Sequence, residues 1–152
     1  EFMARFFERY HGIAKFRPYF WAFCRAQGNR FVNLFNRPRQ VHNLTSYDEY
    51  ERGRAERQAI GSLIQGTAAE LTKESLVRIH DWIRAENVPA ILRLTIHDEI
   101  QLDVEISEVP RVAARVRTFM ESYPEFAPIP ILVDASMSAT NWRDKKKFKI
   151  PT

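Results

Sequence analysis

The sequence predicts an α+β fold in which helices pack on one face of an antiparallel sheet. Apolar residues recur at steps of three and four in several stretches, which is the helical period. Residues 92–106 contain alternating apolar and polar side chains, which is the period of strands. These patterns follow the order helix, strands, helix, hairpin, helix, strand. Because 45% of the 152 residues are hydrophobic, the chain can bury the core of one ordinary domain.

The first third of the chain predicts a helix followed by a hairpin. Aromatic and aliphatic side chains recur at helical spacing across residues 6–23. Pro18 interrupts this stretch, so we expect a kink or two abutting helices there, and Gly28 ends it. Beyond it, residues 30–35 and 40–44 have the composition of two strands joined by a turn.

The middle of the chain predicts two successive helices. A helical stretch covers residues 46–60 and is loosened by Gly61 and Gly66. Residues 67–70 then have the Thr-x-x-Glu form of a capping box, which marks the start of a second helix. That helix is expected to stop at residues 87–89, where the chain reaches a proline.

Two strand patterns cover residues 92–96 and 100–106, with three residues between them. A turn of only two residues would mix apolar and polar side chains on each face, because opposed residues in an antiparallel pair share a face. A three-residue turn sets Ile96 opposite Ile100, and both are apolar. The pattern therefore favours a three-residue connection or a bulge.

The last part of the chain predicts a helix, a strand and a tail. Ser107 has the character of a helix N-cap, with Pro110 in the first turn. An apolar stripe with helical spacing continues to Tyr123. Residues 131–135 predict a final strand, and the lysine-rich residues 144–149 predict a solvated tail.

Positive charge is concentrated in the first part of the chain. Residues 1–57 contain eleven Lys and Arg against six Asp and Glu, whereas the whole chain has a net charge of +4. This part is also rich in Phe, Tyr and Trp, and arginine with aromatic side chains suits a polyanion whose bases can stack. A solvated basic face above an aromatic core has the same composition, so charge alone leaves both interpretations open.

Composition excludes several function classes. The single cysteine, Cys24, rules out a disulfide framework and a multi-cysteine zinc site, and we expect it to be a buried apolar residue. The histidines lack metal-ligand spacing, Ser136 and Ser138 lack the glycine elbow of a serine hydrolase, and there is no phosphate-binding glycine loop. The apolar runs are too short to span a bilayer and no signal sequence is visible, so we expect a cytoplasmic protein without a membrane partner.

Asp98 and Glu99 place two adjacent carboxylates at the tip of the predicted hairpin, in a turn without glycine. Such a pair repels itself unless a cation lies nearby. Carboxylate oxygens on a rigid scaffold suit Mg²⁺, and a two-metal phosphoryl-transfer site needs carboxylates held in this way. An acidic surface turn without a ligand is the alternative, and the turn alone does not decide between the two.

Arg57 and Gln65 lie eight residues apart, a little over two helical turns, so they share a face if the helix is continuous. Arginine suits a phosphate or a minor-groove acceptor, and glutamine suits base edges in the minor groove. Gly66 would let another group approach the backbone closely. An ordinary exposed polar face beside a helix cap is the alternative.

Four stretches, in order, resemble the family A DNA polymerases, the group of bacterial DNA polymerase I and the related phage replicases. They are Phe7-Glu8-Arg9-Tyr10-His11-Gly12, then Arg57-Gln58-Ala59-Ile60 with Gln65-Gly66-Thr67-Ala68-Ala69, then Leu94-Thr95-Ile96-His97-Asp98-Glu99, and finally Val133-Asp134-Ala135 through Asn141-Trp142. The resemblance covers residues 6–142. One such motif is weak evidence, whereas four in order at compatible spacing are strong evidence.

The resemblance implies that residues 3–152 are the C-terminal part of a polymerase domain, with residues 6–60 bordering the fingers and the palm. Residues 94–99 resemble motif C, the β-hairpin of the antiparallel palm sheet. Motif A and the fingers helix, which lie upstream in the family, are absent from this chain. The implied function is template-directed DNA synthesis, in which a nucleotide is transferred from dNTP to the primer 3′-OH.

The resemblance also implies roles for single residues. Asp98 would be catalytic and bind metal, and Glu99 would be catalytic beside it by supporting the metal site or its water shell. His97 would lie near the primer terminus, while Arg57 and Gln65 would contact the minor-groove side of primer–template DNA. The implied cofactor is Mg²⁺, in a two-metal site completed by an aspartate outside this chain. The implied partners are DNA, dNTP and the remaining polymerase domain, on the same chain or on a separate subunit.

Two positions depart from the family pattern. Gly61 stands where the family usually has Asn, and Glu70 stands where it usually has Asp. With half a metal site and no triphosphate clamp, the chain alone is expected to be inactive. A non-catalytic nucleic-acid-binding module with a palm-like fold is the alternative function, and a structural domain with an incidental acidic turn is a third.

Overall fold

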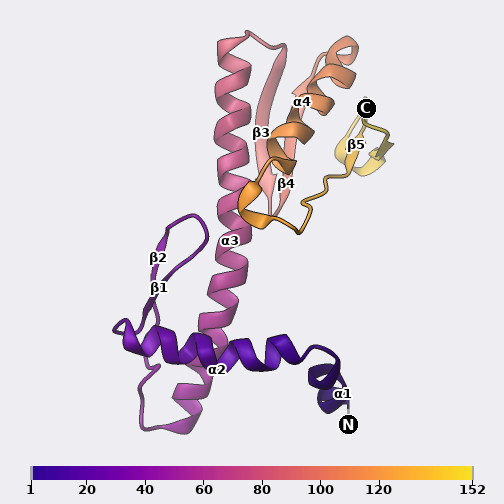
Figure 1. The fold of residues 1–152 in the computed structure, drawn as a ribbon. Helices are drawn as coiled ribbons and strands as arrows, with labels where there is room; N and C mark the ends of the chain where they lie inside the picture. The colour runs from indigo at the N-terminus through magenta and orange to yellow at the C-terminus, as the bar shows by residue number, and fades with distance from the viewer. Residues whose placement is uncertain (1, 152) are drawn as a thin grey trace. The chain divides into compact units, whose positions relative to one another are not determined.

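The computed structural model describes residues 2–151 as an α+β chain (Figure 1). These residues form helices and three separate two-stranded antiparallel sheets. The chain divides into two compact units, of which the first ends at Thr67 and the second begins at Ala68. The predicted α+β class is confirmed, with the strands in separate pairs.

The first unit opens with helices α1, Phe2–Arg9, and α2, His11–Ala26. Two helices do abut here, but their junction lies at Tyr10, and the helix continues through Pro18. A proline removes one amide donor and crowds the preceding turn, yet side chains beyond it are buried in the core of the unit and stabilise the helix. Gly28, with φ of +68°, follows the end of α2 as expected.

Strands β1, Arg30–Val32, and β2, Pro38–Gln40, form the hairpin predicted after α2. Asn33 closes the connecting loop, because its Oδ1 accepts hydrogen bonds from the amides of Phe35 and Arg37 at 3.0 Å each. This closure turns the chain back early. The return strand therefore begins two residues before the predicted one.

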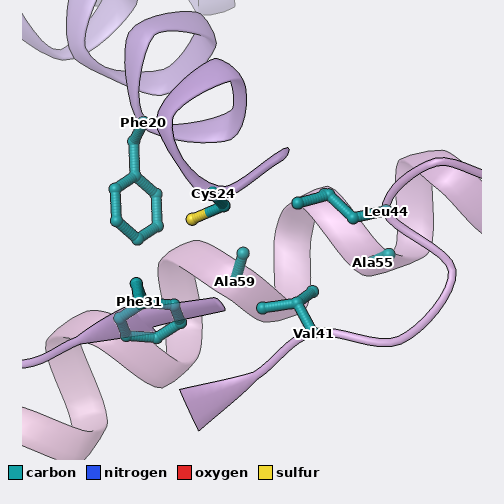
Figure 2. Close-up of a cluster of buried hydrophobic side chains, with 7 residues drawn as sticks. All are labelled: Phe20, Cys24, Phe31, Val41, Leu44, Ala55 and Ala59. Atoms are coloured by element: carbon teal, nitrogen blue, oxygen red, sulfur yellow. The ribbon is translucent and has the colours of Figure 1, made fainter. Parts of the chain in front are cut away.

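Seven buried side chains form the core of the first unit (Figure 2). They come from α2, the hairpin and the loop after it, and the next helix: Phe20, Cys24, Phe31, Val41, Leu44, Ala55 and Ala59. The ring of Phe20 meets that of Phe31 edge-on, with centroids 5.2 Å apart. Cys24 is a free cysteine buried among these side chains, which confirms it as an apolar core residue, and burial raises the pKa of its thiol.

Helix α3, Glu49–Ala85, is one continuous helix of 37 residues that crosses the boundary between the units. The break expected near Gly61 and Gly66 is absent. The predicted capping box is wrong, because Thr67 lies inside the helix and its Oγ1 donates to the Leu63 carbonyl at 2.7 Å. Each interior glycine costs about 1 kcal/mol relative to alanine, and burial of side chains along both halves of α3 outweighs that cost.

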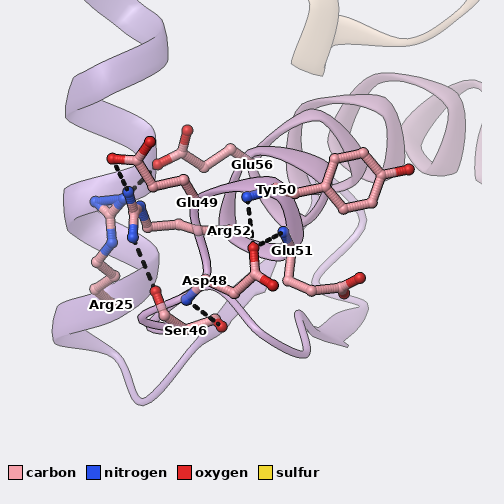
Figure 3. A network of polar contacts seen from close by, with 8 residues as sticks. All are labelled: Arg25, Ser46, Asp48, Glu49, Tyr50, Glu51, Arg52 and Glu56. Atoms are coloured by element: carbon pink, nitrogen blue, oxygen red, sulfur yellow. Dashed lines mark hydrogen bonds and ion pairs between the residues drawn. The ribbon is translucent and has the colours of Figure 1, made fainter.

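Asp48 caps the observed start of α3 (Figure 3). Its Oδ1 accepts hydrogen bonds from the amides of Tyr50 and Glu51 at 2.8 and 3.4 Å. Arg52 donates from Nη1 to the Ser46 carbonyl at 2.9 Å, which holds the preceding turn against the helix. The helix thus begins three residues after the predicted start.

The second unit is built around a hairpin of β3, Ala90–Ile96, and β4, Glu99–Val104. Asn87, with φ of 48°, marks the predicted end of the helical segment before β3. Helix α4, Val109–Glu121, follows the hairpin and is the amphipathic helix expected there.

The two faces of the β3–β4 hairpin differ. Trp82 from α3 and Val112 from α4 are buried with Ala90, and Leu102 and Val104 pack against them on the same face. On the other face, Ile91 and Asp103 lie opposite each other and both are exposed. Helices therefore cover one face of this sheet, as predicted.

The turn between β3 and β4 contains two residues, so the predicted three-residue turn is wrong. Ile96 lies opposite Glu99 at this turn. The alternative prediction of a bulge is confirmed, because the register shifts between Leu92 and Leu94. Beyond the shift, Leu92 lies opposite Leu102, which restores an apolar face for the helices.

The approach to α4 also differs from the prediction. Ser107 lies inside a short 3-10 helix, Ile106–Glu108, and its Oγ donates to Glu105 at 3.1 Å, so it does not cap α4. The 3-10 turn places Glu108 at the N-cap position instead. Pro110 does lie in the first turn of α4.

The C-terminal segment contains the 3-10 helices Pro124–Phe126 and Trp142–Asp144 and the antiparallel strands β5, Ala135–Met137, and β6, Lys146–Phe148. The strand predicted at residues 131–135 is displaced, because the Val133 amide donates to the Glu121 side chain at 2.9 Å. The lysine-rich stretch is not a free tail, since it supplies β6. Among residues 2–151, no helix is long and apolar enough to cross a membrane.

Candidate functional site

The tip of the β3–β4 hairpin exposes His97 and Asp98. His97 has φ of 56°, a left-handed conformation that costs a non-glycine residue about 1–2 kcal/mol and that the two flanking strands impose. Within the part of the chain that the structure describes, no hydrogen bond or ion pair engages the Asp98 carboxylate. Asp98 therefore presents free carboxylate oxygens, which are ligands for a hard cation.

Glu99 begins β4, and three side chains bind its carboxylate. Lys145 Nζ lies 2.9 Å from both carboxylate oxygens, while Gln101 Nε2 and Trp142 Nε1 donate to Oε1 at 3.0 and 3.2 Å. Lys145 Nζ also lies 4.9 Å from the centroid of the Trp142 ring. We refer to these four residues as the Glu99 cluster. The Lys145 hydrogen bond, ahead of the one from Gln101, lowers the pKa of the Glu99 carboxyl below its ordinary value.

Asn141 shapes the turn that carries Trp142 and Lys145. Its Oδ1 accepts a hydrogen bond from the Asp144 amide at 3.2 Å, and its Nδ2 donates to the Asp144 carboxylate at 2.6 Å. The Asn141-Trp142 pair belongs to one of the stretches that resemble family A. The Trp142 indole of this pair donates a hydrogen bond to Glu99 of the acidic turn. Lys145 was missed, because the only signal was one lysine among several that resembled a solvated tail.

Arg57 and Gln65 are both exposed on α3 in the first unit. The helix between them is uninterrupted, which is the condition under which they share a face. The Arg57 guanidinium lies along the helix towards Gly53, because a Cβ on that glycine would be 3.5 Å from Arg57 Nη1. At Gly66, a Cβ would make only ordinary van der Waals contact, with Asn33 Nδ2 at 4.0 Å, so the close approach expected there stays a prediction.

The helical turn that carries Arg57 is anchored to α2 through Glu56. Arg25 Nη2 donates to the Glu56 carboxylate at 2.5 Å (Figure 3). Trp21 Nε1 donates to the Glu56 carbonyl at 3.0 Å. Arg25 Nε also donates to the Leu44 carbonyl at 3.3 Å. Sequence reasoning missed these supporting residues, since nothing in the spacing of α2 and α3 residues says which pairs meet.

The acidic turn offers one free ligand for a metal rather than a complete site. Among residues 2–151 there is no group of three or more His, Cys, Asp or Glu side chains that could hold a metal ion. Asp98 fits one position of a shared site by its exposure and its oxygen chemistry, whereas Glu99 is occupied by Lys145. Arg57 and Gln65 belong to the first unit, and the acidic turn belongs to the second.

Comparison with known proteins identifies the family. The family model described as DNA polymerase family A matches residues 1–144. The chain belongs to DNA polymerase family A. The resemblance seen in the motifs is thereby confirmed, and Lys145 lies immediately beyond the matched residues of this family A chain.

Two curated relatives of this family A chain are bacterial enzymes named DNA polymerase I. The protein from Caldicellulosiruptor bescii is 31% identical over 147 residues, which is 96% of this chain and 17% of that protein. The protein from Lactococcus lactis subsp. lactis is 33% identical over 146 residues, which is 95% of this chain and 16% of that protein. The chain thus spans about a sixth of the length of these relatives.

A solved structure has the same fold. It is the POL domain of Pol1 from M. smegmatis in complex with DNA primer-template and dNTP. The TM-score is 0.76 at 25% sequence identity, over 84% of this chain and 22% of that chain. The fold of the family A chain is therefore that of part of a polymerase domain.

Proposed function

We propose that this chain is the palm-bearing C-terminal part of a template-directed DNA polymerase, which transfers nucleotides from dNTP to a primer 3′-OH. The observation that carries the proposal is the exposed hairpin turn with the Asp98 carboxylate, in a chain that belongs to DNA polymerase family A. The structural neighbour was solved with primer-template and dNTP, which supports the same partners here. The remaining polymerase domain is the third partner, because the chain spans only about a sixth of its relatives.

Asp98 is the catalytic residue that binds metal in this proposal. Its free carboxylate suits Mg²⁺, which keeps several waters and shares its other positions with phosphates. When bound, the ion would neutralise charge on the transferred phosphoryl group and its leaving group. The second aspartate of the two-metal site would come from motif A, outside this chain. Glu99 acts beside Asp98 and supports the turn.

Arg57 and Gln65 contact the minor-groove side of primer–template DNA in this proposal. Both are exposed on one uninterrupted helix, and the Glu56 anchor fixes the turn next to Arg57. Minor-groove acceptors are placed alike in all correct base pairs, so donors there check pair shape without reading sequence. His97, at the exposed tip beside Asp98, lies near the primer terminus.

The chain alone does not extend primers in this proposal, because Asp98 is one ligand of a site that needs more. The test is extension of a labelled primer in Mg²⁺ by the purified chain, and by the same chain supplied with the upstream domain that holds motif A and the fingers helix. Extension is expected only in the second case, and Asp98→Asn abolishes it while DNA binding changes less than about twofold.

Two results would contradict the proposal. Extension by the complete enzyme that persists with Asp98→Asn would remove Asp98 from the chemistry. Salt-dependent DNA binding without extension in any reconstituted form would instead identify a non-catalytic nucleic-acid-binding module.

A further inference from the structure

The two acids of the hairpin turn have unequal surroundings. Asp98 is exposed, and no hydrogen bond or ion pair among residues 2–151 engages its carboxylate. Its neighbour Glu99 makes two contacts to Lys145, one to Trp142 and one to Gln101. Adjacent carboxylates would otherwise compete for the same cation, so the difference separates their roles.

We propose that Lys145 and Trp142 are positioning residues, which keep the Glu99 carboxylate away from the cation that the proposed function assigns to Asp98. The proposal rests on the proposed function of Asp98 and assigns the neighbouring acid a different task. An ammonium group 2.9 Å from both oxygens of Glu99 satisfies the charge that a metal would otherwise neutralise.

The contacts also explain how Glu99 positions its neighbour. Glu99 is the first residue of β4 and lies opposite Ile96, so its backbone is fixed by the ladder. Its side chain is fixed from the other side by the 3-10 turn that Asn141 shapes. Asp98 is one residue away, in a two-residue turn that leaves little backbone freedom. Fixing both ends of Glu99 therefore restricts the backbone from which the Asp98 side chain extends.

Lys147 provides a natural contrast in the same segment. It forms an ion pair with Asp134 at 3.1 Å, but the two side chains are 78% and 86% exposed. In the pair of Lys145 with Glu99, the side chains are 35% and 40% exposed, and Trp142 adds a hydrogen bond and a ring contact. A substitution at Lys147 removes the same charge without touching Glu99, so it is the matched control.

The first test reads the cluster itself, without metal, in the full 152-residue chain. The indole N–H signal of Trp142 in a proton–nitrogen NMR spectrum, assigned with Trp142→Phe, reports its hydrogen bond to Glu99. We expect Glu99→Gln and Lys145→Ala to shift this signal and speed its hydrogen exchange, while Lys147→Ala and Asp98→Asn leave it in place. A signal unmoved by Glu99→Gln and by Lys145→Ala would overturn the proposal.

The second test reads cation binding in the chain supplied with the upstream domain that holds motif A, with Mn²⁺ as the probe and paramagnetic broadening of the turn amides as the readout. Asp98→Asn is expected to weaken Mn²⁺ binding at least about tenfold, whereas Glu99→Gln changes the Kd less than about twofold. Lys145→Ala removes the ammonium group from Glu99 and is expected to tighten Mn²⁺ binding about threefold. Lys147→Ala is expected to tighten Mn²⁺ binding much less. The double variant of Lys145→Ala with Glu99→Gln loses the gain.

The outcomes separate this proposal from the proposed function. Equal weakening of Mn²⁺ binding by Glu99→Gln and Asp98→Asn would make Glu99 a ligand and overturn the proposal, while leaving a metal site at the turn. Mn²⁺ that never broadens the turn would overturn the metal role of Asp98 and with it the division of roles between the acids. If the double variant still binds Mn²⁺ more tightly than the unmodified chain, the gain in affinity came from the lost positive charge and not from Glu99. That result would also overturn the proposal.

Discussion

Two exposed positions, Arg57 that is proposed to contact DNA and Asp98 that is proposed to bind metal, are held by different kinds of contact. Arg57 lies beside Glu56, whose backbone carbonyl is bound by Trp21 and whose carboxylate is bound by Arg25 over the core of the first unit. Asp98 lies beside Glu99, which is held by side chains that remain partly exposed. The helix position is therefore tied to core stability, whereas the turn position is tied to a charge pair that salt can weaken.

The largest expected effect is on the turn. In the complete enzyme, Asp98→Asn should lower the rate of primer extension at least about a thousandfold, because one metal ligand is lost. Glu99→Gln should lower it less than about tenfold, since the acid acts only through the position of its neighbour. Single-turnover extension rates at saturating dNTP give this comparison. Equal losses would remove the distinction between the two acids.

The next effect is on the anchor of the helix. Arg25→Met leaves the Glu56 carboxylate, 19% exposed, without its partner and should lower the free energy of unfolding by about 2 kcal/mol. Arg93→Met removes an ion pair with Asp103 whose side chains are 53% and 63% exposed, and should cost less than about 0.5 kcal/mol. Urea unfolding followed by circular dichroism measures both. Similar costs would mean that the Glu56 anchor is no stronger than a surface pair.

A smaller effect is expected on DNA affinity. Arg57→Ala should weaken binding of primer–template DNA about tenfold, because one phosphate or minor-groove contact is lost. The slope of log affinity against log salt concentration should become shallower by about 1. Arg54→Ala, three residues earlier and also exposed, is the control. Fluorescence anisotropy at several salt concentrations separates the two. An equal loss from both would indicate a diffuse basic face.

The smallest effect is on the helix itself. Gly61→Ala should raise the free energy of unfolding by about 0.5–1 kcal/mol, because the glycine lies inside α3 and a Cβ there would meet nothing within 4 Å. Gly28→Ala should do the opposite, since that glycine has φ of +68°. The two variants are a matched pair, and thermal or urea unfolding measures the change in the free energy of unfolding of each. Destabilisation by Gly61→Ala would indicate a functional bend at that position.

Several features followed from local sequence because local forces decide them. The alternating pattern identified the β3–β4 hairpin, the apolar stripe identified α4, and the proline after Asn87 marked the end of the helical segment. The break near Gly61 and Gly66 was predicted wrongly, because propensity favours a break while burial along a 37-residue helix outweighs it. The predicted length of the turn was wrong as well. A bulge between Leu92 and Leu94, several residues from the turn, brings the apolar side chains of the two strands onto one face.

The sequence by itself determined the family, the α+β class and the candidate residues Arg57, Gln65, His97, Asp98 and Glu99, because these depend on residue type and order along the chain. Only the tertiary structure decided what surrounds them. Contacts between residues far apart in the sequence, such as the 46 positions between Glu99 and Lys145, leave no periodic signal. Those contacts divide an acidic pair of identical chemistry into one free carboxylate and one that is held in place.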